Sequence, residues 1–524
     1  MKFSRILRGV AVATLMGATF LSGTAFAQTT ITGGFDVGPG GAQAKFNPLM
    51  ATAGFTWQSI YYEPLLAYNA ELTQLEGALA SDWQIADDLL SITFNLNEAT
   101  WHDGEDFTSA DVKFSIDLYR NENAGGVFAG RLSAIEAVET PDDRTVVLKL
   151  SRPDGSLLSM LSQAMILPEH ALGSIDPTTM SNISWWSDKP IGTGPFKFNQ
   201  YVTDQYVELV ANEEYRLGRP KVDRLINRYF DNPASAVAAL RAGEIQFTYV
   251  EPDDAATFAN DANFRVIEGA SYVVNYIGFN YLTDLWNDIR VRQAVMHAID
   301  RDTIIESLYN GVATRADCGY TASHLVPEGL DAYAYDPEKA RQLLAEADWA
   351  SINGDKPIPF VTYYNSPQVS NVMAAMQAML SQVGINVVPQ TVDAAQWASI
   401  VYRSPPVADE FPFVYAGLQN GPDPAGINVG LNGSQLPPAG SNVMRVDMPE
   451  LSAAFDTAMS ETNQAEVNAN WQEVCKVMNE QLPWATMWVA NRYGVASTAL
   501  ENFVWTPAPA GGPFLQHAEL WSIK

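Results

Sequence analysis

Histidine and cysteine, the residues most often used for catalysis and metal binding, are scarce in this chain of 524 residues. The five histidines are His102, His170, His297, His324 and His517, and no two of them lie within four residues of each other. A pair of zinc ligands on one helical face needs two histidines about one turn apart, so no such site is expected. The sequence also lacks the G-x-S-x-G, P-loop and complete G-x-G-x-x-G motifs. We therefore expect no catalytic site, no metal site and no cofactor.

Aromatic side chains are the more informative group, with 13 Trp, 21 Tyr and 23 Phe. Such flat, rigid side chains bury a large area at a low entropic cost and suit a cleft that holds an extended ligand. Most of them must nevertheless pack in cores, which aromatic residues also dominate. The composition therefore favours ligand binding without telling which aromatic residues perform it.

The first 27 residues have the features of a secretory signal peptide. Lys2, Arg5 and Arg8 precede an apolar stretch at 10–21, and the small residues Ala25 and Ala27 form an A-x-A cleavage site. The apolar stretch is too short to cross a bilayer, which disfavours the alternative of an uncleaved anchor. Residue 28 is Gln28 rather than the lipid-modified cysteine of a lipoprotein. We expect a soluble, periplasmic protein without stable membrane insertion.

The charge balance excludes some partners. The formal net charge is −29, which argues against nucleic acid and anionic membrane surfaces as partners. Only 17% of the residues are charged and 47% are hydrophobic, which is typical of a globular protein rather than a disordered one.

The only two cysteines are Cys318 and Cys475. In an oxidising compartment an isolated pair is a candidate disulfide. Such a bond would close a long loop and contribute roughly 4–5 kcal/mol in the chain-entropy model. The alternative is two buried free thiols that act as small hydrophobic side chains.

Periodic apolar residues predict several elements in the first half of the chain. Apolar and polar residues alternate over 92–96 and over 146–150, which predicts two half-buried strands. Between them, Thr108 has the position of a helix cap ahead of an apolar face. Asp288 and Asp336 can cap two later helices in the same way.

A β-α-β unit is predicted in the second half. An apolar run at 358–363 is followed by a helical pattern that ends before Gly384, and an apolar segment at 385–388 comes directly after it. A strand, a helix and a strand within about thirty residues imply a partly parallel sheet. We expect α/β lobes joined by crossings of the chain rather than by a flexible linker.

Five spans, in order along the chain, are similar to motifs of one protein family. They are 80–112, with the run W-H-D-G-E-D-F-T-S-A-D-V; 192–198, with G-T-G-P-F-K-F; 236–245; 290–301; and 335–341. Together they resemble the family 5 solute-binding proteins of bacterial ABC importers, the peptide, nickel and oligosaccharide group. The similarity extends from about residue 45 to the C-terminus. In this family the run that contains His102 and Asp103 is a turn between a strand and a helix, so neither residue is expected to bind a metal.

The resemblance implies an α/β fold of the two-lobed periplasmic-binding-protein type (type II-like, with an extra inserted subdomain) and a cleft that closes about a hinge. Lobe I is expected to comprise 28–66, 190–281 and 491–524, the inserted subdomain 67–189, and lobe II 282–490. Both cysteines would then lie in lobe II. The implied function is that of a monomeric binding protein that captures a small solute between its lobes and delivers it to the permease subunits of an ABC importer.

The residue types at 416–424 do not identify the class of solute. Peptide-binding members carry a stretch like G-W-x-A-D-Y-x-D-P, whose Asp pairs with the ammonium group of the peptide. Alignment on the final Pro-Asp-Pro places Gly417 where the Trp belongs and Asn420 where that Asp belongs. Asn cannot neutralise a buried ammonium, but its amide suits hydroxyl groups. In the alternative alignment, shifted by a few residues, Asp423 or another carboxylate serves instead.

Three functions therefore stay open. A peptide or peptide-like solute is the expectation for the family, and an oligosaccharide or glycoside is the alternative that the missing Asp favours. A periplasmic hydrolase is a distant third. The cleft candidates, chosen by residue type and by analogy of position, are Gly417, Asn420 and Asp423 together with the aromatic residues Trp57, Tyr276, Trp397, Tyr415 and Trp488.

Overall fold

The computed structural model describes residues 28–36, 47–49, 58, 60–70, 73–124, 132–203, 205–269, 272–403, 407, 410–419, 423–437, 441–461, 464–505 and 515–524. The expected signal peptide, Trp57 and Asn420 lie outside these residues. None of the helices in the described part of the chain is both long and apolar enough to cross a membrane.

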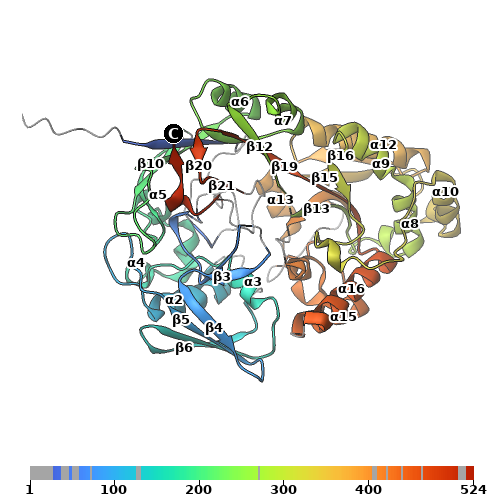
Figure 1. Cartoon of the computed structure of the whole chain (residues 1–524). Coiled ribbons are helices and arrows are strands. Elements are labelled where there is room, and N and C mark those ends of the chain that lie inside the picture. Colours follow the sequence, from blue (N-terminus) through green and yellow to red (C-terminus); the bar gives the residue numbers. More distant parts are fainter. Residues whose placement is uncertain are drawn as a thin grey trace, which may run out of the picture.

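The first lobe is built on a seven-stranded sheet, on the left in Figure 1. In spatial order its strands are β12 (Phe264–Gly269), β19 (Arg492–Ser497), β11 (Phe247–Val250), β1 (Thr30–Asp36), β10 (Arg224–Phe230), β9 (Tyr206–Ala211) and β8 (Phe196–Val202). The central strand β1 pairs in parallel with β10 and β11, and the outer pairings are antiparallel. Helices α6 (Pro233–Arg241) and α7 (Pro252–Phe258) lie at the top of this lobe in Figure 1.

An antiparallel sheet of four strands forms the inserted subdomain, at the lower left of Figure 1. Its strands are, in spatial order, β4 (Ala80–Ile85), β5 (Ser91–Leu96), β7 (Thr145–Leu150) and β6 (Ile135–Asp142). The strands predicted from alternation are β5 and β7, and the predicted cap is confirmed. Thr108 forms a capping box with Asp111 at the start of α2 (Ser109–Arg120).

The subdomain and the first sheet share one continuous core, to which Phe94, Val112 and Leu209 all belong. His102 joins the two parts: its ring accepts a hydrogen bond from Gly192 N at 3.1 Å, and its Nε2 lies 2.9 Å from Gly194 O. Burial lowers the pKa of His102 to about 3, so its ring is neutral. His102 thus connects two of the family-like spans and serves a structural role, as expected.

The second lobe contains a six-stranded mixed sheet. In spatial order its strands are β14 (Ala313–Arg315), β18 (Trp484–Ala490), β13 (Val273–Phe279), β17 (Phe413–Gln419), β15 (Ile358–Thr362) and β16 (Val387–Thr391). Among its helices are α8 (Ile289–Ala298), α9 (Arg301–Leu308), α10 (Pro337–Glu346), α12 (Pro367–Gln382), α13 (Ala394–Val401), α15 (Pro449–Ser460) and α16 (Gln464–Gln481). The predicted β-α-β unit is confirmed, because β15 and β16 pair in parallel and α12 connects them.

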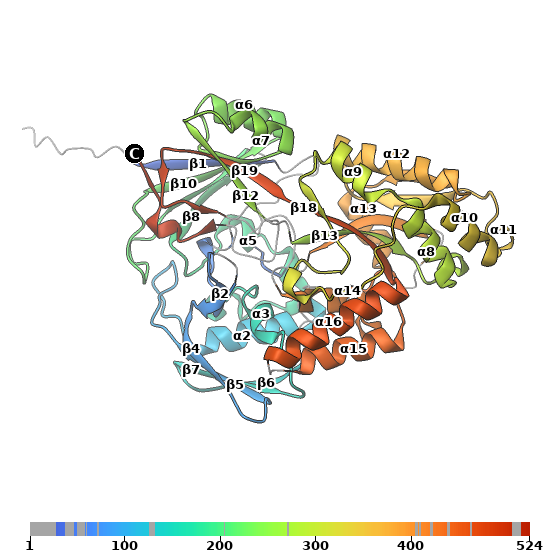
Figure 2. The same cartoon turned by 45° about the vertical axis from the view of Figure 1, so that its right-hand side comes forward.

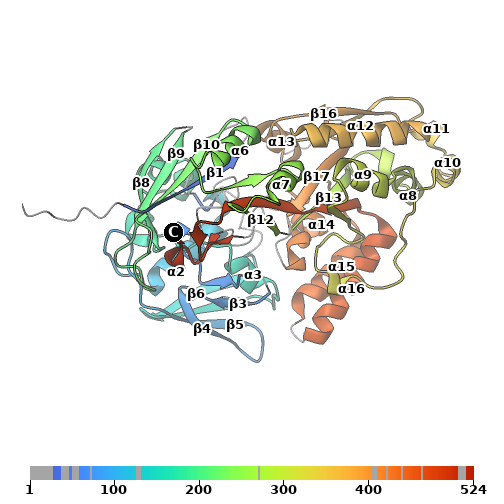
Figure 3. The same cartoon turned by 45° about the horizontal axis from the view of Figure 1, so that its top comes forward.

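Two crossings of the chain connect the lobes. One leads from β12, which ends at Gly269, to β13, which begins at Val273; the other leads from β18 through Asn491 to β19. Figures 2 and 3 show β18 and β19, in red, running in succession from one lobe to the other. The boundary expected at 281 falls after β13, whereas β13 is bonded to β17 and β18 in the second sheet. An apolar strand of this kind carries no local signal for the sheet it joins.

The two cysteines are joined by a disulfide within the second lobe. Their Cα atoms lie 5.3 Å apart, and Cys475 belongs to α16. Both side chains are buried in the same apolar cluster, between the sheet and helices α15 and α16. The bond therefore tethers elements of one lobe and spans neither crossing.

Candidate functional site

A cavity of about 520 Å³ lies beside the two crossings, and we call it the crossing cavity. Its lining includes Glu251, Tyr363, Gly417 and Asn491. These residues lie at or near the carboxyl ends of β11, β15, β17 and β18. In α/β sheets, ligands bind outside the carboxyl ends of the strands. The crossing cavity thus has the location of a ligand site, and both lobes contribute to it.

Tyrosine side chains form much of its wall, namely Tyr249, Tyr309, Tyr363, Tyr364 and Tyr493. The rings of Tyr363 and Tyr364 lie 4.6 Å apart, and the Tyr363 hydroxyl donates to Gly417 O at 3.4 Å. Burial raises the pKa of both tyrosines, so both hydroxyls stay protonated.

The glycine at 417 is required by this packing. A Cβ there would overlap the Tyr364 hydroxyl and the Val273 side chain. A large side chain such as Trp cannot occupy this position while Tyr364 stays in place. At position 417 the chain differs from the family motif, which has Trp there. The cavity still has an aromatic wall, because Tyr364 occupies this space.

The charged residues that line the crossing cavity within the described part of the chain are Glu251 and Arg492. The Arg492 side chain is exposed, lies 5.9 Å from the centre of the Tyr249 ring, and forms no ion pair with any described residue. Helix α12 also begins here, capped by Ser366, which accepts a hydrogen bond from Val369 N at 3.2 Å. A guanidinium group near the positive end of a helix favours a carboxylate.

A larger cavity, of about 730 Å³, lies between the inserted subdomain and the second lobe, and we call it the acidic cavity. The subdomain contributes Asp154 and Leu158, whereas the second lobe contributes Asp423, Glu461 and Trp471. The described residues around it include three carboxylates and His324, but no lysine or arginine. Apolar side chains such as Leu158 and Trp471 make up part of its walls.

Asp423 has the most perturbed carboxyl group of this cavity. One oxygen accepts a hydrogen bond from Ala425 N at 2.9 Å, which caps a short helical turn. The pKa of Asp423 is raised to about 6, mainly by burial and also by the charge of Asp154, whereas hydrogen bonds from Ala425 and Ser159 lower it. Burial also raises the pKa of Asp154, whose partner Arg152 lies 3.7 Å away at the surface.

Direct contacts hold the two lobes together around the cavities. Gly155 N of the subdomain donates to Met459 O at 2.6 Å, and a Cβ at Gly155 would lie only 3.0 Å from Glu461 O. On the other side, Asn310 Nδ2 donates to Asp253 Oδ1 at 2.6 Å. These contacts require the lobes to be close, so the structure represents a closed arrangement.

The structure separates the predicted site residues into three groups. Gly417 lines the crossing cavity and Asp423 lines the acidic cavity. Trp57 and Asn420 lie outside the described residues. The remaining four lie within the second lobe and are discussed next.

Tyr276, Tyr415 and Trp488 are buried in the cores of the second lobe and line neither cavity. Tyr276 stacks on Trp484, with ring centres 3.9 Å apart. Trp397 is half-buried on α13 and packs against Tyr363 at 5.1 Å, behind the wall of the crossing cavity. Residue type alone cannot separate such core aromatics from those in a cavity, because both are buried on the same strands.

Sequence reasoning missed the residues that follow the predicted strand at 358–363, above all Tyr364 and Asn365, and it also missed Arg492 and Asp154. A signal was available for the first two. They come directly after a strand predicted to be parallel, which is where α/β folds place ligands. Arg492 and Asp154 lacked such a signal, because only the spatial arrangement of the lobes brings them to the cavities.

Comparison with known proteins gives consistent matches. The model of the bacterial extracellular solute-binding proteins, family 5 (middle region), matches residues 74–433. A protein of Brucella melitensis that bears the provisional name of ABC transporter peptide-binding protein is 61% identical over 514 residues, which cover 98% of each chain. The oligopeptide-binding protein AppA of Bacillus subtilis, solved with a nonapeptide, has a TM-score of 0.84 at 25% identity, covering 95% of this chain and 99% of AppA.

A more distant structure shares the fold alone. NikZ of Campylobacter jejuni, solved with Ni(L-His), has a TM-score of 0.81 at 23% identity and covers 95% of this chain and 100% of NikZ. The same two-lobed architecture therefore holds chemically different solutes in different proteins. The choice of solute must come from the side chains that line the cavities.

Proposed function

This chain belongs to the bacterial extracellular solute-binding proteins of family 5, and from that premise we propose that it is the periplasmic component of an ABC importer that captures a peptide or peptide-like solute between its lobes. The observation that carries this proposal is the pair of cavities between the lobes, one acidic and one with an unpaired arginine. The proposed solute class agrees with the provisional name of the Brucella relative and with the nonapeptide bound to AppA.

The charges in the cavities suit a solute with both a positive and a negative group. Asp154 and Asp423 can neutralise an ammonium group in the acidic cavity, while Arg492 can bind a carboxylate in the crossing cavity. A peptide with free ends carries both groups. The tyrosine rings in the wall of the crossing cavity offer apolar surface without selecting one side chain.

Capture follows from closure about the two crossings. A solute that touches both lobes makes its full set of contacts only in the closed state, so binding shifts the hinge equilibrium towards closure. Asn491 Nδ2 donates to Glu268 Oε1 at 2.7 Å and so links the second crossing to the end of β12, next to the first. In this proposal the permease subunits recognise the closed form, and the solute is released chemically unchanged.

Export is part of the same proposal. Residues 1–27 are removed as a signal peptide, and the protein then acts in the periplasm as a monomer without a lipid anchor. The family description, which is of extracellular proteins, supports this location.

Native mass spectrometry of protein purified from periplasm without refolding tests the proposed solute class. We expect a stoichiometric adduct whose fragmentation gives amino-acid residues. A bound glycoside would replace the peptide proposal with the oligosaccharide alternative. Turnover of the captured molecule during incubation would contradict the assignment as a binding protein.

A further inference from the structure

Side-chain amides form a further group of polar residues around the crossing cavity. Asn275 and Gln368 both line it, and the nitrogen of each amide is already bonded within the protein. Asn275 Nδ2 donates to Trp488 O at 3.3 Å, and Gln368 Nε2 donates to Leu308 O at 2.8 Å. Asn491, whose Nδ2 is bonded at the second crossing, follows the same pattern.

These bonds fix the orientation of the two amides. A carbonyl oxygen can only accept a hydrogen bond, so the amide nitrogen must face it and the amide oxygen must lie on the other side. Asn275 Oδ1 and Gln368 Oε1 accept no hydrogen bond from the described residues, and neither oxygen is fully buried. Both oxygens can therefore accept a hydrogen bond from a molecule in the crossing cavity.

Local structure holds the two amides in place. Asn275 is 9% exposed and lies where the pairing of β13 with β18 changes register, and such a bulge re-aims the side chain of a strand residue. Gln368 lies in the first turn of α12 and binds a carbonyl at the end of α9, where a helix leaves its carbonyls without internal partners. The two acceptors are thus oriented before a solute binds, which lowers the entropic cost of binding.

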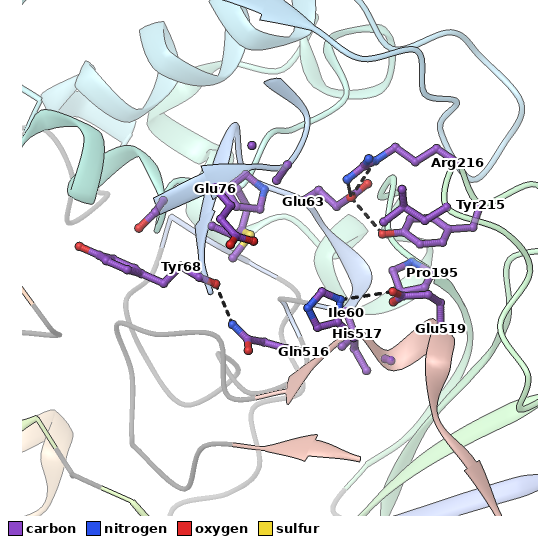
Figure 4. Close-up of a pocket in the computed structure, with 18 of the residues that line it drawn as sticks. Ile60, Glu63, Tyr68, Glu76, Pro195, Tyr215, Arg216, Gln516, His517 and Glu519 are labelled. Atoms are coloured by element: carbon purple, nitrogen blue, oxygen red, sulfur yellow. Dashed lines mark hydrogen bonds and ion pairs between the residues drawn. The ribbon is translucent and has the colours of Figure 1, made fainter. Parts of the chain in front are cut away.

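A smaller cavity, of about 180 Å³, where the inserted subdomain meets the first lobe, shows the opposite case (Figure 4). There Gln516 also donates from Nε2, to Tyr68 O at 2.8 Å, but its Oε1 is fully buried and out of reach of a ligand. Arg216 and Glu63 of the same cavity bind each other at 2.8 Å. These polar groups are used up within the fold, whereas the amide oxygens of the crossing cavity are accessible.

We propose that Asn275 and Gln368 accept hydrogen bonds from the main-chain N–H groups of the last two residues of a peptide. This inference rests on the proposed function, in which Arg492 binds the carboxylate of the same peptide in the same cavity. The N–H groups nearest to that carboxylate are present whatever the side chains are. The cavity therefore selects for peptide bonds rather than for a sequence, and it discriminates against proline at these two positions, because proline has no N–H.

Calorimetry with tetraalanine and its ester analogues tests the proposal. Tetraalanine has free ends and no donors in its side chains, and an ester oxygen in place of one peptide N–H removes a single donor. Esters at the third and at the fourth residue should each weaken binding about tenfold, because an acceptor inside the closed cavity then stays without a donor. An ester at the second residue, towards the acidic cavity, should bind like tetraalanine.

The outcomes separate this inference from the proposed function. Equal binding of all four compounds, or equal losses for the three esters, would overturn the inference alone. If none of the four compounds binds, the proposed function is overturned together with it.

Two variants and a matched control assign the acceptors. Asn275→Leu and Gln368→Leu should each weaken tetraalanine binding about tenfold, and each should abolish the penalty of one ester. Gln377→Leu is the control, because Gln377 lies on the same helix and its Nε2 donates to Val387 O at 2.8 Å, away from the cavity. It should bind all four compounds as the wild type does.

Thermal unfolding shows whether each variant is folded. If Asn275→Leu does not fold, the wild-type series and Gln368→Leu decide. Penalties for both esters that persist in the folded Leu variants at 275 and 368 would overturn the proposal.

Discussion

At the scale of single residues, the cavities differ from the family motif in a consistent way. Gly417 stands where a Trp was expected, and Tyr364 occupies the space that a larger side chain would need. Asp423, from the same stretch, lies in the acidic cavity and faces Asp154 of the inserted subdomain. In the proposed function, the ammonium group of a peptide would therefore have a carboxylate partner even though residue 420 is Asn.

The raised pKa of Asp423 makes solute binding depend on pH. This carboxyl group is protonated below about pH 6 and negatively charged above it, so a cationic group gains its partner as the pH rises through 6. We expect the affinity for a peptide with a free N-terminus to increase between pH 5 and pH 7.5 in titration calorimetry. Asp423→Asn should lower the affinity at pH 7.5 about tenfold and flatten the profile. The control Asp87→Asn, at an exposed position, should keep the wild-type profile.

The same carboxyl group makes folding stability depend on pH in the opposite direction to solute affinity. Its pKa is raised from 3.8 in the unfolded chain to about 6, so the folded protein holds the proton more tightly. The contribution of this group is therefore fully favourable below 3.8 and is lost as the pH rises through 6.

Arg492 provides a second test at this scale. If its guanidinium binds the carboxylate of the solute, Arg492→Gln should weaken the binding of a peptide with a free C-terminus by about tenfold. This is the usual contribution of a charged hydrogen-bonded pair. A peptide with an amidated C-terminus should bind the variant and the wild type equally. Equal losses for both peptides would show that Arg492 acts on the fold rather than on the carboxylate.

At the scale of elements, local signals predicted helices and strands and the parallel pairing within one β-α-β unit, but not the pairing of strands that lie far apart in the sequence. The cap at Thr108 and the alternation in β5 and β7 depend on neighbouring residues, so the sequence carries them directly. The sheet that β13 joins depends on β17 and β18, more than a hundred residues away. The cavities follow from such distant pairings, which is why most of their residues were not predicted.

The disulfide should stabilise the second lobe without affecting capture. The double exchange of Cys318 and Cys475 to Ser removes a link within one lobe, and typical losses are about 2–4 kcal/mol in the free energy of unfolding. Chemical denaturation measures this loss. The solute affinity of the folded variant should equal that of the wild type, and a weaker affinity would mean that the bond also affects the closed arrangement.

At the scale of the whole molecule, the account depends on closure. Gly155 lies against the backbone of the second lobe, where a larger side chain would hold the lobes apart. Gly155→Val should therefore weaken solute binding by at least fivefold, in line with the usual penalty of about 1–3 kcal/mol for overpacking. Calorimetry at constant pH measures this loss. Glu136→Val, on the exposed face of β6, introduces the same side chain away from the contact and should bind normally.

Small-angle X-ray scattering, with and without the peptide found by mass spectrometry, tests the central claim most directly. Capture between two hinged lobes predicts that saturating peptide lowers the radius of gyration of the wild type. It also predicts that the radius of gyration of Gly155→Val, with peptide present, stays nearer to that of the open, peptide-free protein. The account would be contradicted by a peptide that binds in calorimetry while the radius of gyration of the wild type is the same with and without it.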